Sequence, residues 1–387
     1  MAGPPFVFGR IAAHDNFVDR EQERNRLRAN FSTLTNTVIV SPRRWGKSSL
    51  VQKVADDVQQ HDSRTRVCLI DLFNVRSEAD FYAHLAEGVM SATMTKWDEW
   101  AEVAGKFLSH LRPKVSISPG PGQEITLDVD WHEVQRDPDE VLDLAEKIAA
   151  AKKVGLIVCL DEFQTIASYG HSDAFQRKLR SHWQQHQHVC YCLYGSKRHM
   201  LLDVFSNPDM PFYRFGDIMT LGKIENVIWG DFIAARFAAT GKTITADLGR
   251  RIASLVDDHS YYVQQLAQQV WLRTKKTCHP EDVDAAWADL TDQLGLVFTG
   301  LVDSLTARQV NFLQAVLDDQ QCLSSQATIK AYNLGTSANV NRIKQALINR
   351  EIIDVDSTGV QFLDPVFKNW LVVRYFTPSD SHRAPAA

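Results

Sequence analysis

The chain has 387 residues, a length typical of two or three domains that each bury a hydrophobic core. Hydrophobic residues make up 44% and charged residues 23%, as in ordinary globular proteins, and the net charge of −5 excludes a chain-wide attraction to nucleic acid or anionic membrane. The sequence holds no run of about 18 apolar residues and no signal-peptide pattern, so we expect a cytoplasmic protein without a membrane partner.

The N-terminal part of the chain contains the pattern of a phosphate-binding loop. A charged helix is expected within residues 14–35, and the segment 38–50 (VIVSPRRWGKSSL) follows it. The β-branched residues at its start predict a buried parallel strand that ends at Ser41, and Gly46 begins a helix that runs to Val58. Strand, loop and helix N-terminus in this order are typical of nucleotide sites, and the loop matches GxxxxGK[ST] except that Ser41 replaces the first glycine.

This loop supplies most of the predicted nucleotide-binding residues. Gly46 lets the backbone approach the phosphates, Lys47 reaches the β- and γ-phosphates of ATP, and Ser48 ligates Mg²⁺ through its hydroxyl. The predicted cofactor-binding residues of the loop are Ser41, Pro42, Arg43, Arg44, Trp45, Gly46, Lys47, Ser48 and Ser49. Arg43 and Arg44 raise the positive potential of the loop, or instead face solvent or a covering domain. An accidental GKS in a loop is the alternative interpretation.

A second half of the same site is expected about 110 residues later. The apolar run 155–160 (GLIVCL) predicts a buried strand that ends in Asp161 and Glu162. Asp161 would hold Mg²⁺ through water, and Glu162 would polarise the attacking water as a general base. Two acids after a strand are often only solvated, but behind a phosphate loop they indicate a P-loop NTPase that is able to hydrolyse ATP.

The other elements of this half alternate between strands and helices. Strands are expected at 66–72 and 188–194, helices at 77–95, 137–151 and 173–186, and a small β-hairpin insertion at 112–132. Such alternation predicts an α/β fold with a parallel sheet sandwiched by helices, and with the loop and Asp161 at the carboxyl ends of its strands. The six cysteines are scattered, mostly in apolar strands and without a CxxC pair, which predicts buried free thiols.

From about residue 222 the sequence becomes helical. Helices are expected at 225–240, 245–257, 260–276 and 280–292. The segment 304–376 then reads as three helices and a short hairpin, with helices at 323–334 and 337–349 joined at Gly335, and strands at 352–355 and 360–363. This is the winged-helix pattern. The predicted domains are a P-loop ATPase domain at 1–221, an all-α lid at 222–300, a winged helix at 301–376 and a disordered tail at 377–387.

Several ordered motifs together carry a resemblance to a known family. They are FVDRE (17–21), SPRRWGKSSL (41–50), LDEFQ (160–164), LYGSKRHM (193–200), MPFYRFGDIMTL (210–221), HSYYVQQLAQQVW (259–271) and DPVFKNWL (364–371). The chain resembles the archaeal-type ATPases, a branch close to the STAND and origin-recognition AAA+ P-loop NTPases. The resemblance implies ATP binding as a conformational switch. Two departures are Asp19, where the family's FxGRExE box has glycine, and Ser41 in the phosphate loop.

The resemblance also implies roles for single residues. Ser196 or Lys197, or in their place Arg198, stands where a sensor of the γ-phosphate is expected, although an ordinary polar strand end is the alternative. Arg214 resembles an arginine placed near the phosphate of a neighbouring subunit or of its own site. A structural salt bridge is the alternative for Arg214. A neighbour's arginine would require a homo-oligomer, a state that the sequence leaves open.

Three further residues are implied as nucleotide contacts. Phe17 and Val18 are expected to pack near the adenine, with a hinge strut as the competing interpretation. His259 lies in the lid segment that closes on nucleotide in STAND-like proteins, although a histidine at a helix start is more often structural.

The winged helix offers a candidate surface for duplex DNA. Its second helix would enter the major groove, and the residues suited to bases or phosphates are Lys330, Asn339, Asn341, Arg342 and Lys344. Acidic residues follow in and after the wing at Asp354, Asp356 and Asp364. Winged helices also dock proteins or lock their own chain, and that alternative remains open.

Three functions are therefore compatible with the sequence. The first is an ATP-hydrolysing switch, in which nucleotide closes the lid and repositions the winged helix toward a partner. The second is a DNA-associated ATPase. The third is a low-turnover scaffold that signals through bound ATP or ADP.

Overall fold

The structure is a computed structural model that describes residues 3–12, 17–108, 114–117, 125–128, 138–169, 172–356 and 359–377. Internal contacts divide the chain into two compact units. One is Arg10–Lys223, and the other combines the described parts of Met1–Gly9 and Ile224–Ala387. The predicted disordered tail lies almost wholly outside the described residues.

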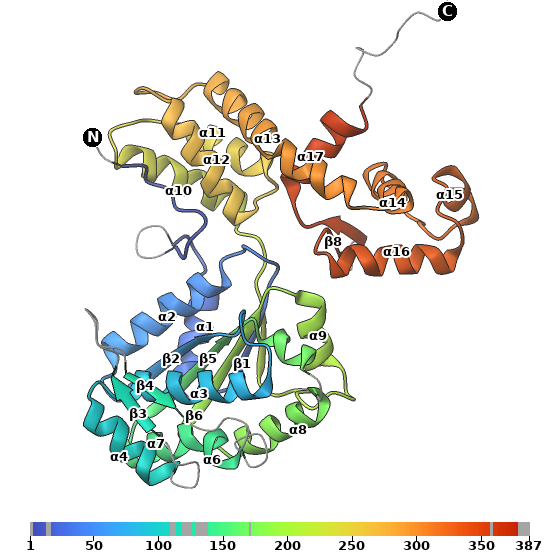
Figure 1. The fold of residues 1–387 in the computed structure, drawn as a ribbon. Coiled ribbons are helices and arrows are strands. Elements are labelled where there is room, and N and C mark those ends of the chain that lie inside the picture. Colours follow the sequence, from blue (N-terminus) through green and yellow to red (C-terminus); the bar gives the residue numbers. More distant parts are fainter. Residues whose placement is uncertain are drawn as a thin grey trace, which may run out of the picture. The chain divides into compact units, whose positions relative to one another are not determined.

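A five-stranded sheet forms the centre of the first unit (Figure 1). Its strands run in the order β2 (Thr65–Asp71), β5 (Gly155–Asp161), β6 (Val189–Gly195), β1 (Thr37–Val40) and β7 (Asp217–Thr220). Every neighbouring pair is parallel, as the sequence predicts. The edge strand β7 was not expected, because its four residues are only partly apolar and partly exposed. Since all strands point the same way, the segments that follow them gather at one edge of the sheet.

Alternation along the strands gives the sheet two buried faces. In β1, Val38 and Val40 point into one core and Ile39 into the other. Helices α1 (Glu21–Ser32) and α2 (Lys47–His61) cover the Ile39 face, where Leu27, Leu50 and Val54 are fully buried. The predicted helix–sheet–helix sandwich is therefore confirmed.

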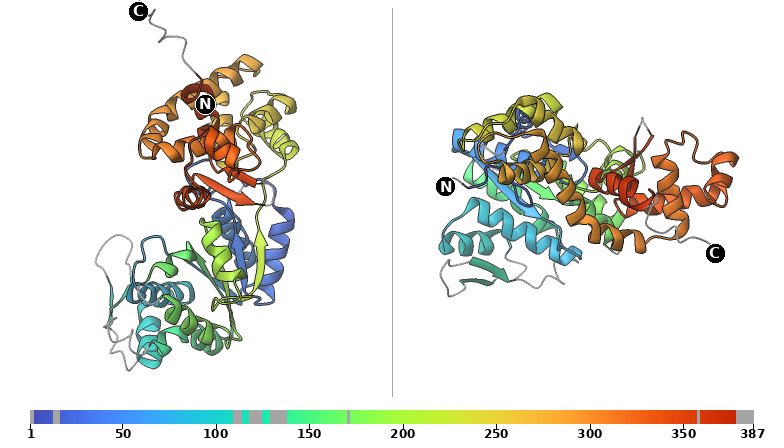
Figure 2. Two further views of the ribbon diagram at one scale, coloured as in Figure 1. Left: turned by 90° about the vertical axis from the view of Figure 1, so that its right-hand side faces the viewer. Right: turned by 90° about the horizontal axis from the view of Figure 1, so that it is seen from above.

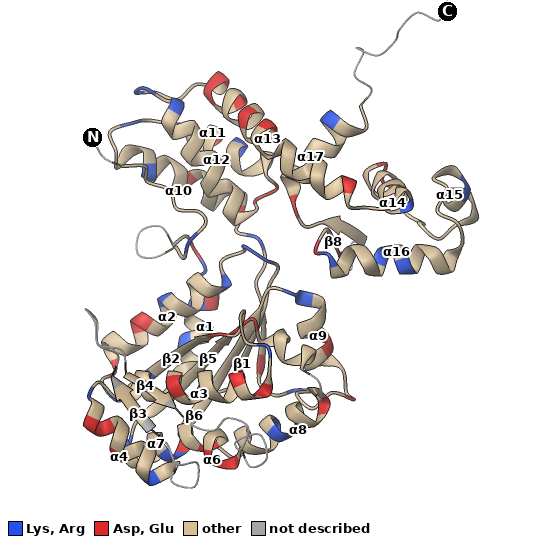
Figure 3. Cartoon of the chain, viewed as in Figure 1, with Lys and Arg blue, Asp and Glu red and all other residues tan. Residues whose placement is uncertain are grey.

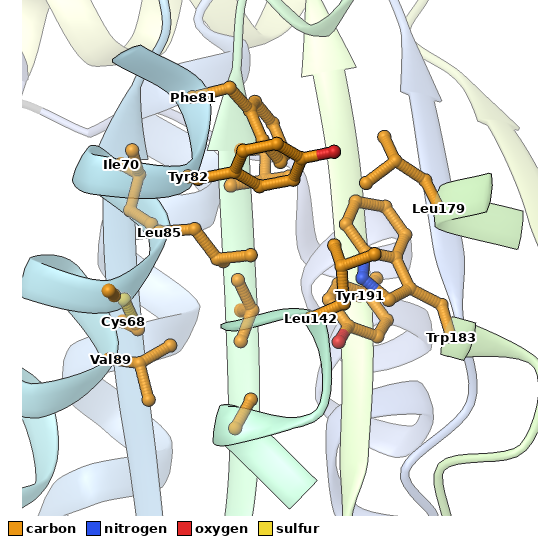
Figure 4. Packing of buried hydrophobic residues seen from close by; sticks show 14 of the residues in the cluster. Cys68, Ile70, Phe81, Tyr82, Leu85, Val89, Leu142, Leu179, Trp183 and Tyr191 are labelled. Atoms are coloured by element: carbon orange, nitrogen blue, oxygen red, sulfur yellow. The ribbon is translucent and has the colours of Figure 1, made fainter. Parts of the chain in front are cut away.

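The opposite face carries the larger core, whose centre is shown in Figure 4. Helices α3 (Glu78–Thr93), α6 (Asp139–Leu142), α7 (Leu144–Lys152), α8 (Ser172–Trp183) and α9 (Arg198–Ser206) contribute to it. The Trp183 ring stacks on Tyr191 of β6 at a centroid distance of 4.0 Å. Aromatic stacking of this kind fixes α8 over the sheet.

The hairpin insertion is confirmed in its two strands. Helix α4 (Trp97–Phe107) precedes β3 (Lys114–Ile117), which pairs antiparallel with β4 (Ile125–Asp128). The residues that connect these strands lie outside the described ranges.

The second unit begins with four helices, α10 (Asn226–Ala238), α11 (Ala246–Leu255), α12 (Ser260–Arg273) and α13 (Pro280–Asp303). The sequence predicts that the last of these ends at residue 292, but α13 continues to Asp303. Residues 293–303 contain no proline and bury Phe298 and Val302, so packing extends the helix. The expected boundary between lid and winged helix at residue 300 consequently falls inside one helix.

The winged-helix segment has the expected order of elements. Helices α14 (Ala307–Leu317), α15 (Gln326–Ala331) and α16 (Ser337–Asn349) precede the antiparallel strands β8 (Ile353–Asp356) and β9 (Gly359–Phe362), and α17 (Pro365–Trp370) follows. Helix α15 is shorter than predicted. Gly335 has a φ of 90° between α15 and α16, a left-handed conformation that favours glycine and confirms the predicted turn. Figure 2 shows these elements from two further directions.

Lid and winged helix are joined by side-chain contacts within this unit. Phe298 of α13 lies 5.3 Å from the ring of Phe367 and 5.8 Å from that of Trp370, both in α17. The Tyr262 hydroxyl of α12 donates to Asp364, the residue that caps α17, at 2.5 Å. These contacts and the continuous α13 make the two parts one compact body.

The N-terminal residues pack on the helical unit rather than on the P-loop unit with which the sequence analysis grouped them. Phe6 is buried against Phe232 and Phe237, and the Val7 amide donates to Gln264 of α12. Apolar burial explains the difference, because Phe6 needs a core and finds it on α10.

Two expectations about composition can be compared with the described residues. Cys68, Cys159, Cys190, Cys192 and Cys278 are free and buried as predicted, whereas Cys322 is free but exposed. Among the helices that the structure describes, none is long and apolar enough to cross a membrane.

Replacing Phe298 by alanine tests the joint between α13 and α17. We expect Phe298→Ala to lower the free energy of unfolding by about 3–4 kcal/mol, because a buried ring leaves a cavity between the two helices. The control is Val297→Ala on the same helix, where the side chain is 65% exposed and we expect a loss within about 0.5 kcal/mol. Urea unfolding of both variants measures the difference, and equal losses would contradict the packing described here.

Candidate functional site

The candidate site lies at the carboxyl edge of the sheet, where three segments meet. The loop 41–46 follows β1, Asp161 ends β5 with Glu162 directly after it, and Ser196 follows β6. Because β6 lies between β1 and β5, Ser196 is placed between the loop and the acidic pair. All of these residues were expected at the site from the sequence, and the order of the strands brings them together.

The backbone of the loop is shaped to receive an anion. Arg44 and Gly46 adopt positive φ angles of 66° and 94°, and α2 begins immediately afterwards at Lys47. No side chain among the described residues caps the start of α2, and its first turn carries no acidic residue. The first N–H groups of the helix are thus left for a negatively charged ligand.

Ser41 fits the loop although a glycine is expected there. Its backbone is not left-handed, unlike that of Arg44 and Gly46, so a side chain brings no strain. The Ser41 hydroxyl donates to the carbonyl of Pro42 at 3.0 Å, which keeps it against its own backbone. The departure from the motif therefore leaves the loop geometry intact.

The segment before α1 braces this loop through a residue that the sequence analysis did not name. Arg20 is buried, and its guanidinium donates to the carbonyl of Trp45 at 3.2 Å. The same side chain pairs with Glu23 at 3.0 Å. The one signal in the sequence was the position of Arg20 in the FVDRE motif, because an arginine before a charged helix does not by itself predict a contact with the loop.

The other loop residues divide by exposure. Arg43 and Arg44 are exposed, whereas Ser49 is buried and its hydroxyl accepts from the Ala12 amide at 3.0 Å. Phe17 packs beside the core under α1 and α2, and Val18 is buried. The adenine contacts predicted for Phe17 and Val18 stay predictions.

Lys47 and Ser48 face the acidic pair across the edge of the sheet. The Ser48 hydroxyl donates to Asp161 at 2.6 Å. The Lys47 ammonium lies 3.5 Å from Glu162 and 3.9 Å from Asp161, and its side chain is 9% exposed. The two carboxylates neutralise the buried Lys47 ammonium, and the negative charge of a triphosphate would neutralise it as well.

The two acids have opposite pKa shifts. Burial raises the pKa of Asp161 above its ordinary value, and this effect outweighs the opposing contributions of Lys47 and Ser48. For Glu162 burial also acts upward, but the Lys47 charge and the hydrogen bonds from Gln164 and Ser196 outweigh it and lower the pKa. Glu162 is consequently the acid that stays ionised more readily, as a base must.

The position of Glu162 is fixed by its neighbours. Its φ of 54° turns the chain out of β5, and its amide donates to Asp161 at 2.8 Å. Ser196 donates to Glu162 Oε2 through its hydroxyl at 2.9 Å and its amide at 3.3 Å. Gln164 donates to the same oxygen. Ser196 thus lies in the site, and its role as a sensor of the γ-phosphate stays a prediction, while Gln164 belongs to a quoted motif but was given no role.

The donor set fits a nucleoside triphosphate with Mg²⁺. The uncapped start of α2 and Lys47 offer positive charge to phosphates, and Ser48 with Asp161 offers the hard oxygen ligands that Mg²⁺ prefers. Among the described residues no group of three or more His, Cys, Asp or Glu is arranged to hold a metal.

Arg214 lies near the amino-terminal ends of the strands, opposite the carboxyl ends where the candidate site lies. It precedes β7, whose first residue Asp217 pairs with Thr37 at the start of β1. Arg214 is exposed, and its guanidinium lies 5.1 Å from the ring of Tyr213. The parallel topology therefore separates Arg214 from the phosphate loop of its own chain.

His259 belongs to the second unit. It stands directly before α12, is buried, and lies 5.0 Å from the ring of Tyr262. The predicted contact of His259 with nucleotide stays a prediction.

The candidate DNA-binding residues share one part of the winged helix. Asn341 and Arg342 are exposed on α16, while Val340, Ile343 and Leu347 face the core. The remaining candidates are Lys330, which is exposed, and Asn339 and Lys344, which are half-buried. In Figure 3 the blue segments of α15 and α16 mark these basic positions.

The comparisons with known proteins agree with this architecture. A family model described as a probable winged helix domain matches residues 296–373. A Walker-type ATPase of Pyrococcus abyssi aligns with a TM-score of 0.66 and 17% identity over 95% of this chain and 100% of its own. The ORC2 protein of Aeropyrum pernix in its ADP form aligns with a TM-score of 0.55 and 12% identity over 96% and 100%. No curated protein matches the chain by sequence.

These similarities confirm the fold expected from the sequence, a P-loop ATPase sheet followed by helices and a C-terminal winged helix. The resemblance drawn from the motifs is confirmed at the level of the fold, which the chain shares with a Walker-type ATPase and an origin-recognition protein at 17% and 12% identity. The assignment to the STAND branch stays a prediction.

Lys47→Met tests the charge balance of the nucleotide-free site. Removing the lysine takes away the largest of the contributions that lower the Glu162 pKa, so much of the stability that this carboxylate contributes above the unfolded value of about 4.3 is lost. We expect a loss of about 1–3 kcal/mol at pH 7 that shrinks as the pH falls toward 4, because both carboxyl groups then accept protons.

The matched control is Lys53→Met on the same helix. Lys53 pairs with Asp57 at 3.0 Å, but Asp57 keeps Arg24 and Arg28 as partners. We expect a loss below about 1 kcal/mol for this variant. Urea unfolding across the pH range measures both, and a loss for Lys47→Met that does not change with pH would contradict the proposed balance.

Proposed function

We propose that the chain binds ATP and Mg²⁺ at the carboxyl edge of its sheet and hydrolyses the nucleotide as a conformational switch. The observation that carries the proposal is the convergence of Lys47, Ser48, Asp161 and Glu162 beside an uncapped helix start. Structures of similar fold carry nucleotide, since the Aeropyrum pernix protein is described in an ADP form.

Each residue of the site has a distinct task in this proposal. Lys47 and the first amides of α2 bind the phosphates, and Ser48 and Asp161 hold Mg²⁺. The bound Mg²⁺ neutralises phosphate charge. Ser196 orients Glu162 through its two hydrogen bonds and, in this proposal, also senses the γ-phosphate.

Glu162 serves as the general base that polarises the attacking water. One of its oxygens, Oε2, accepts hydrogen bonds from Ser196 and Gln164, while Oε1 faces Lys47 at 3.5 Å. When Lys47 turns to the phosphates, Oε1 is released toward the bound ligand. Nucleotide binding therefore prepares the base for the water.

In this proposal the lid and the winged helix move together as one body, and this shared movement is the result of nucleotide binding. Because α13 is continuous and Tyr262 bonds to Asp364, a displacement of the lid carries the winged helix with it. In this proposal His259, three residues before Tyr262, reports the nucleotide to the lid. Arg214, exposed at the far edge of its own sheet, fits a contact with the site of a neighbouring subunit in a homo-oligomer.

Two variants test hydrolysis. Glu162→Gln is expected to lower kcat by about 10²–10⁴-fold while ATP still binds, because the amide cannot take a proton from water. Lys47→Ala is expected to weaken ATP binding as well, because the phosphates lose their cation. Phosphate release and calorimetric titration with ATP and Mg²⁺ measure the two effects.

The low-turnover scaffold is the outcome that opposes this proposal. If wild type and Glu162→Gln release phosphate at the same background rate while ATP or ADP copurifies with the protein, the chain is a nucleotide-binding scaffold. If both variants hydrolyse ATP like the wild type, the assignment of the site is wrong.

A second candidate function is binding of duplex DNA through the winged helix. The observation that favours it is the composition of α16, which contains Arg342 and Lys344 but no acidic residue. The exposed Asn341 is suited to hydrogen-bond base edges. A docking site for a protein partner is the competing role, since acidic residues follow in and after the wing.

Charge reversal on α16 distinguishes these roles. Arg342→Glu with Lys344→Glu is expected to weaken duplex binding and to reduce the slope of log Kd against log salt by about 1 per lost phosphate contact. Lys275→Glu with Lys276→Glu changes the net charge equally at exposed lysines outside the winged helix and should leave binding unchanged. Fluorescence anisotropy of a labelled duplex measures both, and equal effects would remove the DNA proposal.

A further inference from the structure

Gln164 is the buried polar residue of the site that has no task so far. It lies in the short helix Phe163–Ser168 directly after Glu162 and is 3% exposed. Its side-chain nitrogen donates to Glu162 Oε2, the oxygen that also accepts from Ser196. Its own oxygen is buried and has no hydrogen-bond partner among the described residues.

This placement is poor for stability alone. Burying an amide oxygen without a partner costs free energy, so a methionine of similar shape would suit a merely structural position better. The side-chain nitrogen of Gln164 nevertheless meets one specific carboxylate oxygen, Glu162 Oε2. The interaction therefore serves Glu162.

The neighbouring strand makes room for this amide. A Cβ at Gly195, the last residue of β6, would lie 1.8 Å from Gln164 Oε1 and 2.9 Å from its Cδ. Gly195 is needed here for space, because its φ is not in the left-handed region. The backbone of β6 and the amide of Gln164 thus fit together beside Glu162.

We propose that Gln164 is a positioning residue for hydrolysis, which holds Glu162 Oε2 so that Oε1 faces the attacking water. The inference rests on the function proposed above and adds a residue to its machinery. Ser196, which follows β6, and Gln164, which lies in the turn after β5, both donate to Oε2. The other oxygen, Oε1, is then the one that faces the attacking water. The Lys47 ammonium lies 3.5 Å from Oε1.

The central test replaces Gln164 by methionine, which keeps the shape and removes the donor. We expect kcat to fall about 10- to 100-fold with KM for ATP unchanged, because Glu162 loses its orientation while the phosphate contacts remain. In the Glu162→Gln background the same substitution should bring no further loss. Gly195→Ala should lower kcat in the same way by displacing the amide.

The matched control is Gln176→Met. Gln176 of α8 is also buried, and its oxygen also has no partner among the described residues, but it lies outside the site. This variant should keep the wild-type kcat. It separates the loss of a buried glutamine from the loss of this contact.

A second readout needs no nucleotide. Melting temperatures of the wild type, Glu162→Gln, Gln164→Met and the double variant form a cycle. We expect the shifts of the single variants to differ from additivity by about 2–4 °C, because the two side chains share one hydrogen bond. Additive shifts in melting temperature would contradict a hydrogen bond between Gln164 and Glu162.

The outcomes separate the inference from its premise. If the wild type is no more active than Glu162→Gln, the proposed hydrolysis fails and the inference with it. If the wild type is active and Gln164→Met has an unchanged or higher kcat, or loses activity equally in the Glu162→Gln background, only the positioning role is overturned.

Discussion

The arrangement of the site depends on one interaction, the placement of the Lys47 ammonium between Asp161 and Glu162. It brings together a helix start and a strand end that are more than a hundred residues apart in the sequence. A buried cation needs a counter-charge, and the two carboxylates provide it. A triphosphate would provide it equally well, so the same side chain is stable in two positions. In the proposed function, that equivalence would let a bound nucleotide alter the site without disturbing the fold.

The parallel sheet is what makes this interaction possible. Because β1, β5 and β6 point the same way, the loop, the acids and Ser196 end at one edge. The same rule places Arg214 at the opposite edge. The parallel direction of the strands thus decides which residues lie at the site of their own chain and which lie away from it.

In the proposed switch, a change at the nucleotide site would displace the winged helix only if the lid and the winged helix move as one body. The continuous α13, the Phe298 contacts with α17 and the bond between Tyr262 and Asp364 all oppose separate motion of lid and winged helix. The chain passes between the two bodies after Gly9 and after Lys223. In the proposed switch, the chain would change conformation at these two passages.

The sequence predicted the parts of the fold that follow from local pattern. Apolar runs located β1, β5 and β6, and the GKS and DE motifs located Lys47, Ser48, Asp161 and Glu162. It missed β7, whose residues are too few and too polar to signal a strand. The length of α13 was also missed, because its extension depends on packing against α17. Gln164 and Arg20 were not assigned roles, since their partners become neighbours only through folding.

The most direct test of the central claim is a crystal structure of Glu162→Gln with ATP and Mg²⁺. The account predicts a triphosphate along the backbone of residues 41–49, with the Lys47 ammonium moved from the acidic pair to the phosphates and Mg²⁺ beside Ser48 and Asp161. A lysine still held between the two acidic positions, with the nucleotide bound elsewhere or not at all, would contradict it.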